Sequence, residues 1–555
     1  MFVLWYTVKN TLIDGGNMLS FDKFHFSARG SLISVARVQE NLVLHALHNG
    51  GMVPMMELGF SGDTVENFLP WELQITQGDN IHKICLFGKE GACFSGKGTS
   101  PCLEYIYMKG VYNANYIYEG DNILKLCDCF TNTFHTFKIS KGRVHIDTAD
   151  SERRIYKKYI KISVLPDENG EYEFTLRLST RERSVYTDLT YDEYSKSRKD
   201  EFLAWVEQTK AQSEYEKMCS YILWSNIISA EGNYDRDAIV MSKSGMCKLW
   251  SWDNTFNALD LADKDFELSY NQFIYPYRFM DNHGRTPDTV TTVFMERAFV
   301  KPPIQGWIYK QLVKKNKRYE DIEVIDELYY YMKKNTDWWL NYRGNTPCYY
   351  HGNDSGNDNA TCFDNTEIIE SPDLIAYLSV QCEVLSQMAE KLNLCMDTRI
   401  YKMLSKELLE KCVTHFWDGE IYIRNGMTEE IYRPQSLMPL RMIVLEDKLP
   451  EDIRAYIIGK LKTDFLGPYG LASESIHSPH YTTNGYWRGP AWGPDQIIFG
   501  LALRNMGENE LSEQVAKNYK SAIEKSGFSE NHDPLTGDAL KCKAYTWTAN
   551  AYRLL

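Results

Sequence analysis

The sequence predicts a multidomain protein in which an N-terminal antiparallel β-sandwich precedes an all-α domain. From about residue 20 to 190, short segments such as SLISVARVQENLVLHAL and EYEFTLRLST alternate apolar and polar residues between Gly, Asn and Asp turns. Six or more such strands without an intervening helix favour an antiparallel sandwich. We assign residues 1–195 to this domain.

From about residue 197 the apolar period changes to 3.6, which indicates helices. In SPDLIAYLSVQCEVLSQMAEKLN, Ser371 is expected as N-cap and Pro372 as the first helical residue. The apolar stripe of this helix contains Leu374, Leu378, Leu385, Met388 and Leu392. About eleven helical segments are expected between residues 200 and 555. Residues 196–225 are expected to form a linker helix and residues 226–555 the all-α domain.

Composition excludes several classes of protein. The chain has 555 residues and 61 Lys and Arg against 75 Asp and Glu, and this net charge of −14 argues against a nucleic-acid partner. No apolar run of eighteen residues is present, so no membrane span is expected. The thirteen cysteines show no C-x-x-C pair, which favours free thiols in a reducing cytoplasm. Oligomeric state cannot be read from the sequence.

The N-terminus has no basic segment before its apolar run and no clear cleavage site, so a signal peptide is not expected. The strand-rich text begins just after Met18. This methionine is therefore a candidate translation start, with residues 1–17 outside the native protein.

Four loops of the all-α domain combine aromatic and polar residues. They are LWSWDNTF at 249–256, NDSGNDN at 353–359, NGYWRGPAWGPD at 484–495 and FSENHDPLTGDAL at 528–540. Trp, Arg and carboxylates gathered at helix ends have little purpose in a purely structural domain. We therefore expect function in these loops.

The loop at 353–359 is dense in Asp and Asn, as a calcium loop would be. An EF-hand that started at Asp354 would place Gly356 third and Asn365 twelfth, where oxygen ligands are needed. That pattern fails. No cofactor is expected, although an irregular structural calcium site and a solvated turn both stay open as alternatives.

Glu530 and Asp533 lie in the fourth loop, upstream of the Pro534 and Gly537 turn. One carboxylate in each of two facing loops is the minimum equipment for glycoside hydrolysis, in which one acid protonates the leaving oxygen while the other activates water. Taken alone, Glu530 would more simply cap a turn.

The third and first loops suit sugar recognition. Arg488 offers a fork of donors to hydroxyl or carboxylate groups. Tyr486, Trp487 and Trp492 could stack on pyranose faces. Asp253, between Trp252 and Asn254, is a residue type well suited to bidentate contact with two adjacent hydroxyl groups. For each loop taken alone, a structural interpretation is simpler: the tryptophans are buried in the core and the aspartate caps a helix.

Over roughly residues 240–555 the chain resembles glycoside hydrolase family 63, the processing α-glucosidase-like enzymes related to trehalase. The resemblance rests on SWDNTF, KPPIQGW, SGNDN, GYWRGPAW and ENHDPLTG, of which YWRGPAW and ENHDPLTG are the most specific. It implies an (α/α)6 barrel preceded by a β-sandwich, and hydrolysis of α-glycosidic bonds with inversion. Lys301 and His532 depart from the family's usual Gln and Tyr.

By this resemblance Asp358 is the implied general acid and Glu530 the implied general base. The residues expected to bind substrate are Trp252, Asp253, Asn254, Gly356, Asn359, Tyr486, Trp487, Arg488, Trp492 and His532. A proton donor must be protonated at the working pH, so Asp358 is expected to be buried beside Trp side chains and carboxylates. Glu530 is expected to stay ionised, with the two carboxyl groups about 6.5–9.5 Å apart to admit water.

The expected reaction is that of an inverting α-glucosidase acting on small α-linked oligosaccharides or glycosides. An inverting phosphorylase stays open, although it would need no protein base. So do other substrates, namely a mannosyl- or glucosyl-glycerate or an α-rhamnoside. A sugar-binding protein without catalysis is disfavoured because both carboxylates are present.

Overall fold

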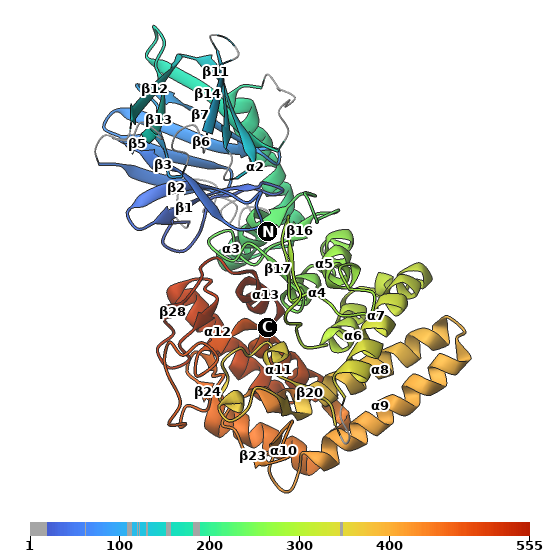
Figure 1. The fold of residues 1–555 in the computed structure, drawn as a ribbon. Helices are drawn as coiled ribbons and strands as arrows, with labels where there is room; N and C mark the ends of the chain where they lie inside the picture. The colour runs from blue at the N-terminus through green and yellow to red at the C-terminus, as the bar shows by residue number, and fades with distance from the viewer. Residues whose placement is uncertain are drawn as a thin grey trace, which may run out of the picture. The chain divides into compact units, whose positions relative to one another are not determined.

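The computed structural model describes residues 19–60, 63–107, 114–118, 120, 122–128, 131–150, 157–180, 189–344 and 348–555. The proposed start at Met18 and residues 1–17 lie outside these ranges. The chain divides into two compact units (Figure 1). The first comprises Met1–Lys248 and Thr291–Phe294, and the second Leu249–Val290 and Met295–Leu555.

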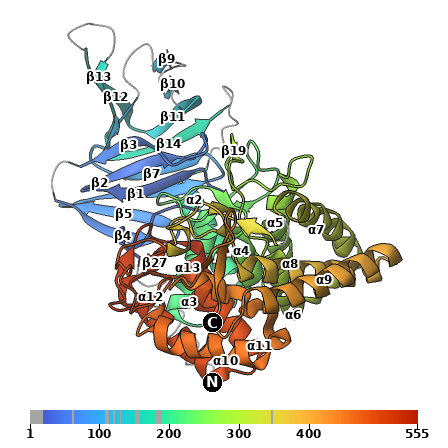
Figure 2. The ribbon, with the colours of Figure 1, turned by 60° about the horizontal axis from the view of Figure 1, so that its bottom comes forward.

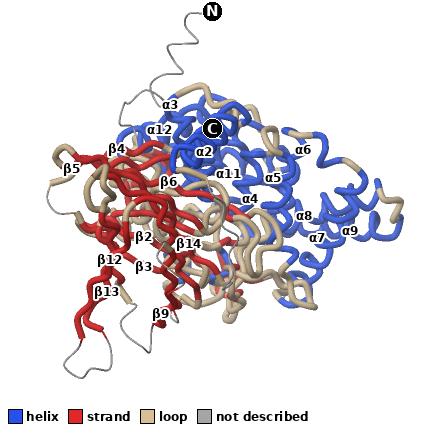
Figure 3. The backbone as a smooth tube through the Cα atoms, turned by 90° about the horizontal axis from the view of Figure 1, so that it is seen from above, coloured by secondary structure: helices blue, strands red, loops and turns tan. Residues whose placement is uncertain are grey.

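The first unit contains two antiparallel sheets, drawn red in Figure 3. The six-stranded sheet has the order β1 (Ile33–Val38), β2 (Asn41–Ala46), β3 (Val53–Gly59), β8 (Cys102–Tyr105), β13 (Lys157–Leu165), β12 (Arg143–Asp150). The eight-stranded sheet has the order β4 (Val65–Leu69), β5 (Glu72–Gln77), β6 (Asn80–Phe87), β7 (Gly91–Lys97), β14 (Glu171–Ser179), β11 (Thr133–Lys141), β10 (Ile123–Asp128), β9 (Ala114–Tyr118). The predicted antiparallel strands are therefore confirmed.

Buried aromatic side chains hold these sheets together. Phe94 on β7 and Phe174 on β14 are register partners, and their rings stack with centroids 4.6 Å apart. Tyr105 on β8 contacts His135 on β11 through its hydroxyl at 2.9 Å, which links one sheet to the other. Since His135 is fully buried, desolvation lowers its pKa to about 3 and leaves it neutral.

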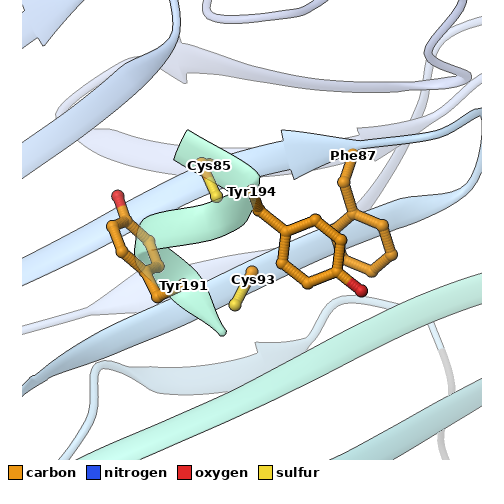
Figure 4. Packing of buried hydrophobic residues seen from close by; sticks show 5 residues of the cluster. All are labelled: Cys85, Phe87, Cys93, Tyr191 and Tyr194. Carbon is orange, nitrogen blue, oxygen red and sulfur yellow. The ribbon is translucent and has the colours of Figure 1, made fainter. Parts of the chain in front are cut away.

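Two helices, α2 (Tyr191–Gln208) and α3 (Glu214–Asn226), belong to this first unit. Each begins with a capping box, built by Thr190 with Glu193 and by Ser213 with Glu216. The first turn of α2 packs on β6 and β7 (Figure 4). The packed cluster consists of Cys85, Phe87, Cys93, Tyr191 and Tyr194.

The second unit is mainly helical (Figure 2). Its helices are α4 (Asp253–Leu261), α5 (Phe266–Arg278), α6 (Gln305–Lys315), α7 (Ile322–Tyr342), α8 (Pro372–Lys391), α9 (Cys395–His415), α10 (Glu451–Lys460), α11 (Gly493–Asn505), α12 (Asn509–Ser526) and α13 (Thr546–Leu554), with a long 3₁₀ segment η4 (Met438–Lys448). The long helix predicted after Ser371 is α8, and it has Pro372 in its first turn as expected.

Six of these elements contact one another in a closed cycle. Helix α4 contacts α6, α6 contacts α8, α8 contacts η4, η4 contacts α11, α11 contacts α13, and α13 contacts α4 again. Four of the six also pack against the next helix in sequence, in the pairs α4–α5, α8–α9, η4–α10 and α11–α12. Figures 1 and 2 show α8 and α9 side by side. No described helix is long and apolar enough to cross a membrane.

Short strand pairs fix the loops at the ends of these helices. They are β17 (Leu249–Trp250) with β18 (Thr289–Val290) and β19 (Met295–Glu296); β20 (Tyr350–His351) with β21 (Ile369–Glu370), β22 (Ile423–Asn425) and β23 (Ile431–Tyr432); β24 (Leu466–Gly467) with β25 (Gly470–Leu471); and β26 (Ala491–Trp492) with β27 (Asn531–His532) and β28 (Ala539–Leu540). The β26–β27 pairing joins the YWRGPAW and ENHDPLTG segments directly.

Candidate active site

The loop that carries Asp358 begins with a short turn, Asn353–Ser355, which Asp354 and Gly356 hold in place. Asp354 accepts hydrogen bonds from Arg343 at 2.8 and 3.0 Å and from the Val300 amide at 3.1 Å. Gly356 follows in the left-handed region at φ +75°, and a Cβ there would lie 3.0 Å from Cζ2 of Trp252. A glycine is therefore required for the loop to lie against Trp252.

Asp358 itself lies at the open side of the site. Its side chain is 37% exposed, and its Oδ1 lies 3.5 Å from Nζ of Lys301. The expectation of a buried proton donor beside tryptophans is therefore wrong. The contact with Lys301 could not be predicted from the sequence, because Lys301 lies 57 positions upstream of Asp358. Lys301 departs from the family pattern, but that departure does not show which carboxylate its charge contacts.

Lys301 is the cation of a cluster of carboxylates. Its Nζ lies 3.1 Å from Oδ1 of Asp288, and its side chain is only 9% exposed. Burial alone would lower the pKa of Lys301, but Asp358, Asp288 and Asp253 outweigh burial and raise it. Burial in turn raises the pKa of Asp288, against the opposing charge of Lys301.

Asp253, the first residue of α4, is only 3% exposed. Burial raises its pKa to about 8, Asp288 and Glu530 add to the effect, and Lys301 opposes it. Tyr545 has its pKa raised by burial and by the charges of Asp253 and Glu530. Near neutral pH, Asp253 is thus a proton-bearing group able to donate a hydrogen bond.

Glu530 precedes β27 and is only 4% exposed. Its backbone carbonyl accepts from the indole of Trp547 at 2.7 Å, and its carboxylate accepts from the amide of Cys542 at 3.3 Å. Burial raises the pKa of Glu530 to about 7, and the charge of Asp358 adds to this rise. The expectation that Glu530 stays ionised therefore holds only above about pH 7.

Tyr486 connects the acids from separate loops. Burial raises its pKa, the charges of Asp358, Glu530 and Asp253 raise it further, and so does a hydrogen bond with Asp358. Its backbone adopts φ 65°, an unusual conformation for a bulky residue and one that clusters at functional sites. Three carboxyl groups from three loops thus converge on one half-buried phenol.

Three buried tryptophans, called here the tryptophan floor, lie against Tyr486 and the acid loop. Trp487 and Trp492 stack with centroids 4.0 Å apart, and Trp252 lies 6.4 Å from Trp487. All three are at most 2% exposed, and their predicted stacking on a sugar stays a prediction. Of the predicted aromatic contacts, Tyr486 is the one that is not fully buried.

Arg441, which the sequence analysis missed, supports this floor. Its guanidinium is fully buried, 5.4 Å from the Trp252 ring centroid and 5.5 Å from that of Trp487. It donates to Oδ1 of Asp495 at 2.7 Å and to Oδ1 of Asn357 at 2.6 Å. Arg441 therefore fixes the residue that directly precedes Asp358.

Two of the predicted sugar contacts instead join the acid loop to the YWRGPAW loop. Arg488 pairs with Asp364 and donates from Nε to the Asn359 carbonyl at 2.7 Å. Asn359 donates to the Gly485 carbonyl at 2.9 Å and accepts from the Trp487 amide at 2.9 Å. These contacts fasten the two loops to each other, and the sugar-binding roles of Arg488 and Asn359 stay predictions.

Two further residues predicted to bind substrate are fully buried and bonded to other parts of the protein. Asn254 is fully buried and donates to Gln272 at 3.1 Å inside the helical layer. His532 is also fully buried, donates to the Gly527 carbonyl at 2.8 Å and packs edge-on against Tyr519. Their predicted roles in substrate binding stay predictions. Residue type alone did not predict the direction in which these side chains face.

In the Asp-rich loop, the Arg343 guanidinium pairs with the carboxylate of Asp354. Among the described residues one other group could hold a metal ion, namely Cys348, Glu370 and His415, whose ligand atoms lie within 4.8 Å of one another. Arg424 contacts Nε2 of His415 at 3.1 Å and lies 3.9 Å from Glu370, so a positive charge is already there.

Residues 246–548, more than half of the chain, match the family described as the mannosylglycerate hydrolase MGH1-like glycoside hydrolase domain. The chain belongs to this MGH1-like family. The match contains all four loops described above. It also confirms the resemblance to glycoside hydrolase family 63, the family named for a structural neighbour of this chain.

Relatives of this MGH1-like chain differ in how much of it they match. The mannosylglycerate hydrolase of Thermus thermophilus is 31% identical over 81 residues, which are 15% of this chain and 20% of that enzyme, so the aligned part spans about a fifth of the relative. The crystal structure of a family 63 mannosylglycerate hydrolase from Thermus thermophilus in complex with glucose covers 62% of this chain and 99% of its own, at 17% identity and a TM-score of 0.53. A bacterial glucoamylase complexed with acarbose covers 97% of this chain and 94% of its own, at 12% identity and a TM-score of 0.60. The two structural likenesses are of fold alone.

Proposed function

We propose that the protein is an inverting α-glycosidase that uses Asp358 as general acid and Glu530 as general base. The observation that carries this proposal is the convergence of both carboxylates on Tyr486, although they lie in loops 172 positions apart. Membership of the MGH1-like glycoside hydrolase family supports the reaction class. Inversion needs two carboxyl groups with room for water between them.

In the proposed reaction, Asp358 gives its proton to the glycosidic oxygen as the bond from that oxygen to the anomeric carbon breaks. A water molecule attacks the anomeric carbon from the opposite face and passes one proton to Glu530. Exchange with solvent then returns a proton to Asp358 and removes one from Glu530. The pKa of Glu530, about 7, suits a base that must take up a proton near neutral pH.

Asp253, Tyr486 and Tyr545 are proposed to hold the sugar that is cleaved off. Below about pH 8, Asp253 carries a proton and can donate to a hydroxyl group without adding a charge to the site. The phenol of Tyr486 supplies the accessible aromatic face. Trp492 packs edge-on against the Tyr486 ring, with centroids 4.9 Å apart, and helps to keep it in place.

Two substrate classes are proposed: small α-glucosides, and α-mannosyl or α-glucosyl glycerates. The first follows from the resemblance to processing α-glucosidases. The second is favoured by the names of the matched family and of the relative in Thermus thermophilus. Both are small α-glycosides, which fits a site whose deep groups are almost closed to solvent.

The proposed architecture is a β-sandwich followed by an (α/α)6 barrel. The closed cycle of α4, α6, α8, η4, α11 and α13, with outer helices packed on its members, supports the barrel. The two antiparallel sheets support the sandwich. Twelve described cysteines carry no disulfide, which supports the proposal that the protein works in a reducing compartment such as the cytoplasm.

A panel of substrates tests the function. Purified protein is given α-linked glucose disaccharides, aryl α-glycosides, and the α-mannosyl and α-glucosyl glycerates, and proton NMR identifies the anomer released first. We expect hydrolysis of at least one α-glycoside with the β-anomer appearing first. Retention, or turnover only when inorganic phosphate is added, would overturn the proposal.

The roles of the two acids are tested by Asp358→Asn and Glu530→Gln. Each should lower kcat at least about a hundredfold, because proton transfer by a positioned group contributes about 10²–10⁴ in rate. Both substitutions preserve shape, so the melting temperature should stay near that of the wild type. Substantial activity in either variant would refute the assignment.

A further inference from the structure

A cavity in the first unit lies outside the region that matches the glycoside hydrolase family. Its volume of about 340 Å³ is near the lower end of the range for ligand sites in proteins. The residues that line it come from strands of both sheets and from the segments at the ends of those strands. All of them precede residue 246, where the family match begins. The family therefore assigns no function to this cavity.

Three charged residues cross one wall of the cavity in a row. Glu57 on β3 is the register partner of Glu104 on β8, and Glu104 is the register partner of Lys161 on β13. Nζ of Lys161 lies 3.0 Å from Oε2 of Glu104, whereas Glu57 forms no ion pair within the described part of the chain. Like charges directly opposite on neighbouring strands are destabilising. Glu57 therefore has a cost for the fold that a role in binding would explain.

The rest of the lining is mainly polar and uncharged. Thr99 and Ser163 contribute hydroxyl groups, and Phe60 contributes a half-buried aromatic ring. The Phe60 ring centroid lies 5.8 Å from that of His82, which is 1% exposed. Burial lowers the pKa of His82, so its ring is neutral, and its Nε2 has no hydrogen-bond partner among the described residues.

This lining disfavours three classes of ligand. Two glutamates and one lysine leave a net negative charge, which repels anions such as phosphate. Phe60 and Pro101 are too small an apolar surface for a lipid-like ligand. The carboxylates of the cavity are not in the group of described residues whose ligand atoms lie close enough together for a metal ion, which is Cys348, Glu370 and His415. A neutral ligand with several hydroxyl groups is the class that fits.

We propose that this cavity binds a neutral sugar, with Glu57 as its main polar contact. An ionised carboxylate is an acceptor with two oxygens, so Glu57 accepts hydrogen bonds from two neighbouring sugar hydroxyls. The ring of Phe60 packs against the C–H groups of the sugar. The hydroxyl of Ser163 serves a further sugar hydroxyl. This site belongs to the first unit and goes beyond the proposed reaction, whose acids belong to the second unit.

Saturation-transfer NMR titrations of the full-length protein with glucose and with mannose test the proposal. Neither monosaccharide contains a glycosidic bond to be hydrolysed. We expect at least one of them to bind. Glu57→Gln should lower the affinity of one binding component about tenfold or more, because a hydrogen bond to a charged group is lost. Phe60→Leu should weaken the same component several-fold, since it keeps the apolar contact and removes the ring.

The matched control is Glu171→Gln, which changes a partly exposed glutamate of β14 that pairs with Lys141 at 2.9 Å outside the cavity. It should leave sugar binding unchanged. Glu57→Gln should not lower the melting temperature, because it removes the repulsion from Glu104. A loss of affinity in this variant is then a loss of contact and not of fold.

Two results would overturn the proposal. A sugar held at the proposed active site alone would bind the wild type, Glu57→Gln and Phe60→Leu equally. Titrations with calcium chloride and with inorganic phosphate run in parallel, and a response to either that Glu57→Gln abolishes, without any sugar response, would assign the cavity to an ion. Failure of the proposed catalytic function is recognised separately, because Asp358→Asn and Glu530→Gln would then keep their activity.

Discussion

Arg441 donates from Nε to Oδ1 of Asp495 over 2.7 Å, and neither side chain is more than 1% exposed. The same guanidinium bonds Asn357 and lies against two tryptophans of the floor. A buried ion pair in this place joins helix α11, segment η4 and the loop of the proposed acid. Removal of this ion pair should therefore act first on the stability of the fold, and on the catalytic rate only through the loss of that stability.

Arg441→Met should lower the free energy of unfolding by about 3–5 kcal/mol, because it leaves the carboxylate of Asp495 buried without a partner. Urea unfolding followed by tryptophan fluorescence measures the loss. The control is Lys317→Met, which removes an ion pair whose lysine is 77% exposed and should change stability by less than about 1 kcal/mol. Equal losses in the two variants would contradict this assignment of Arg441.

Asp253 should make stability depend on pH. Its pKa in the folded protein, about 8, lies above its ordinary value of 3.8, so the folded state binds the extra proton. The stabilisation is complete below about pH 4 and is lost as the pH rises toward 8. Asp253→Asn cannot lose a proton. The stability of this variant relative to the wild type should therefore grow between pH 4 and 8, by up to about 1.4 kcal/mol per pH unit.

Denaturation at several pH values measures this difference. The control is Asp538→Asn, since the exposed Asp538 has its pKa held below the usual value by a hydrogen bond with Lys525. Its effect on stability should not change between pH 5 and 8. A wild-type minus Asp253→Asn difference that is flat with pH would show that Asp253 stays ionised.

The pair Arg488 and Asp364 should act as one unit. Arg488→Ala and Asp364→Ala each unfasten the acid loop, so each should lower kcat about tenfold to a hundredfold through misplaced Asp358, with little change in KM. The double variant should be no worse than the worse single variant, because one interaction is lost in all three. A direct sugar contact by Arg488 would instead raise KM in Arg488→Ala alone.

Gly356→Ala should damage both the fold and the reaction. Its φ of +75° costs an alanine about 1–2 kcal/mol, and the new Cβ would also lie 3.0 Å from the Trp252 ring. Gly507→Ala is the matched control, because Gly507 has φ +80° and nothing within 4 Å of its Cβ position. Thermal unfolding should show a larger loss for Gly356→Ala, and only that variant should lose kcat. Equal losses would mean that the contact with Trp252 has no cost.

Local signals in the sequence predicted the elements well. The change of period near residue 197 separated the strands from the helices, and Pro372 placed the start of α8. The four polar and aromatic loops do supply the groups that converge on Tyr486. These predictions succeeded because period, caps and turns are encoded by neighbouring residues.

Burial and pairing in the site could not be predicted in the same way. Arg441 lies in MPLRMIVL, which reads as an apolar stretch, and its partner Asp495 is 54 positions away. Lys301 was noted as a departure from the family pattern, but its contact with Asp358 depends on how two distant loops fold together. The directions of Asn254 and His532 depend likewise on long-range packing.

The cycle of helices is completed by its last member. Helix α13 meets α4 through Asn550, which donates to Asn257 at 2.7 Å, and through Arg553, which lies 3.2 Å from Asp260. These partners are 293 positions apart, so a ribosome that is making the protein has translated α4 long before α13 emerges. During that interval Asp253 has no Glu530 or Tyr545 beside it. The nascent chain therefore carries α4 without the partners of Asn257 and Asp260 until α13 has been made.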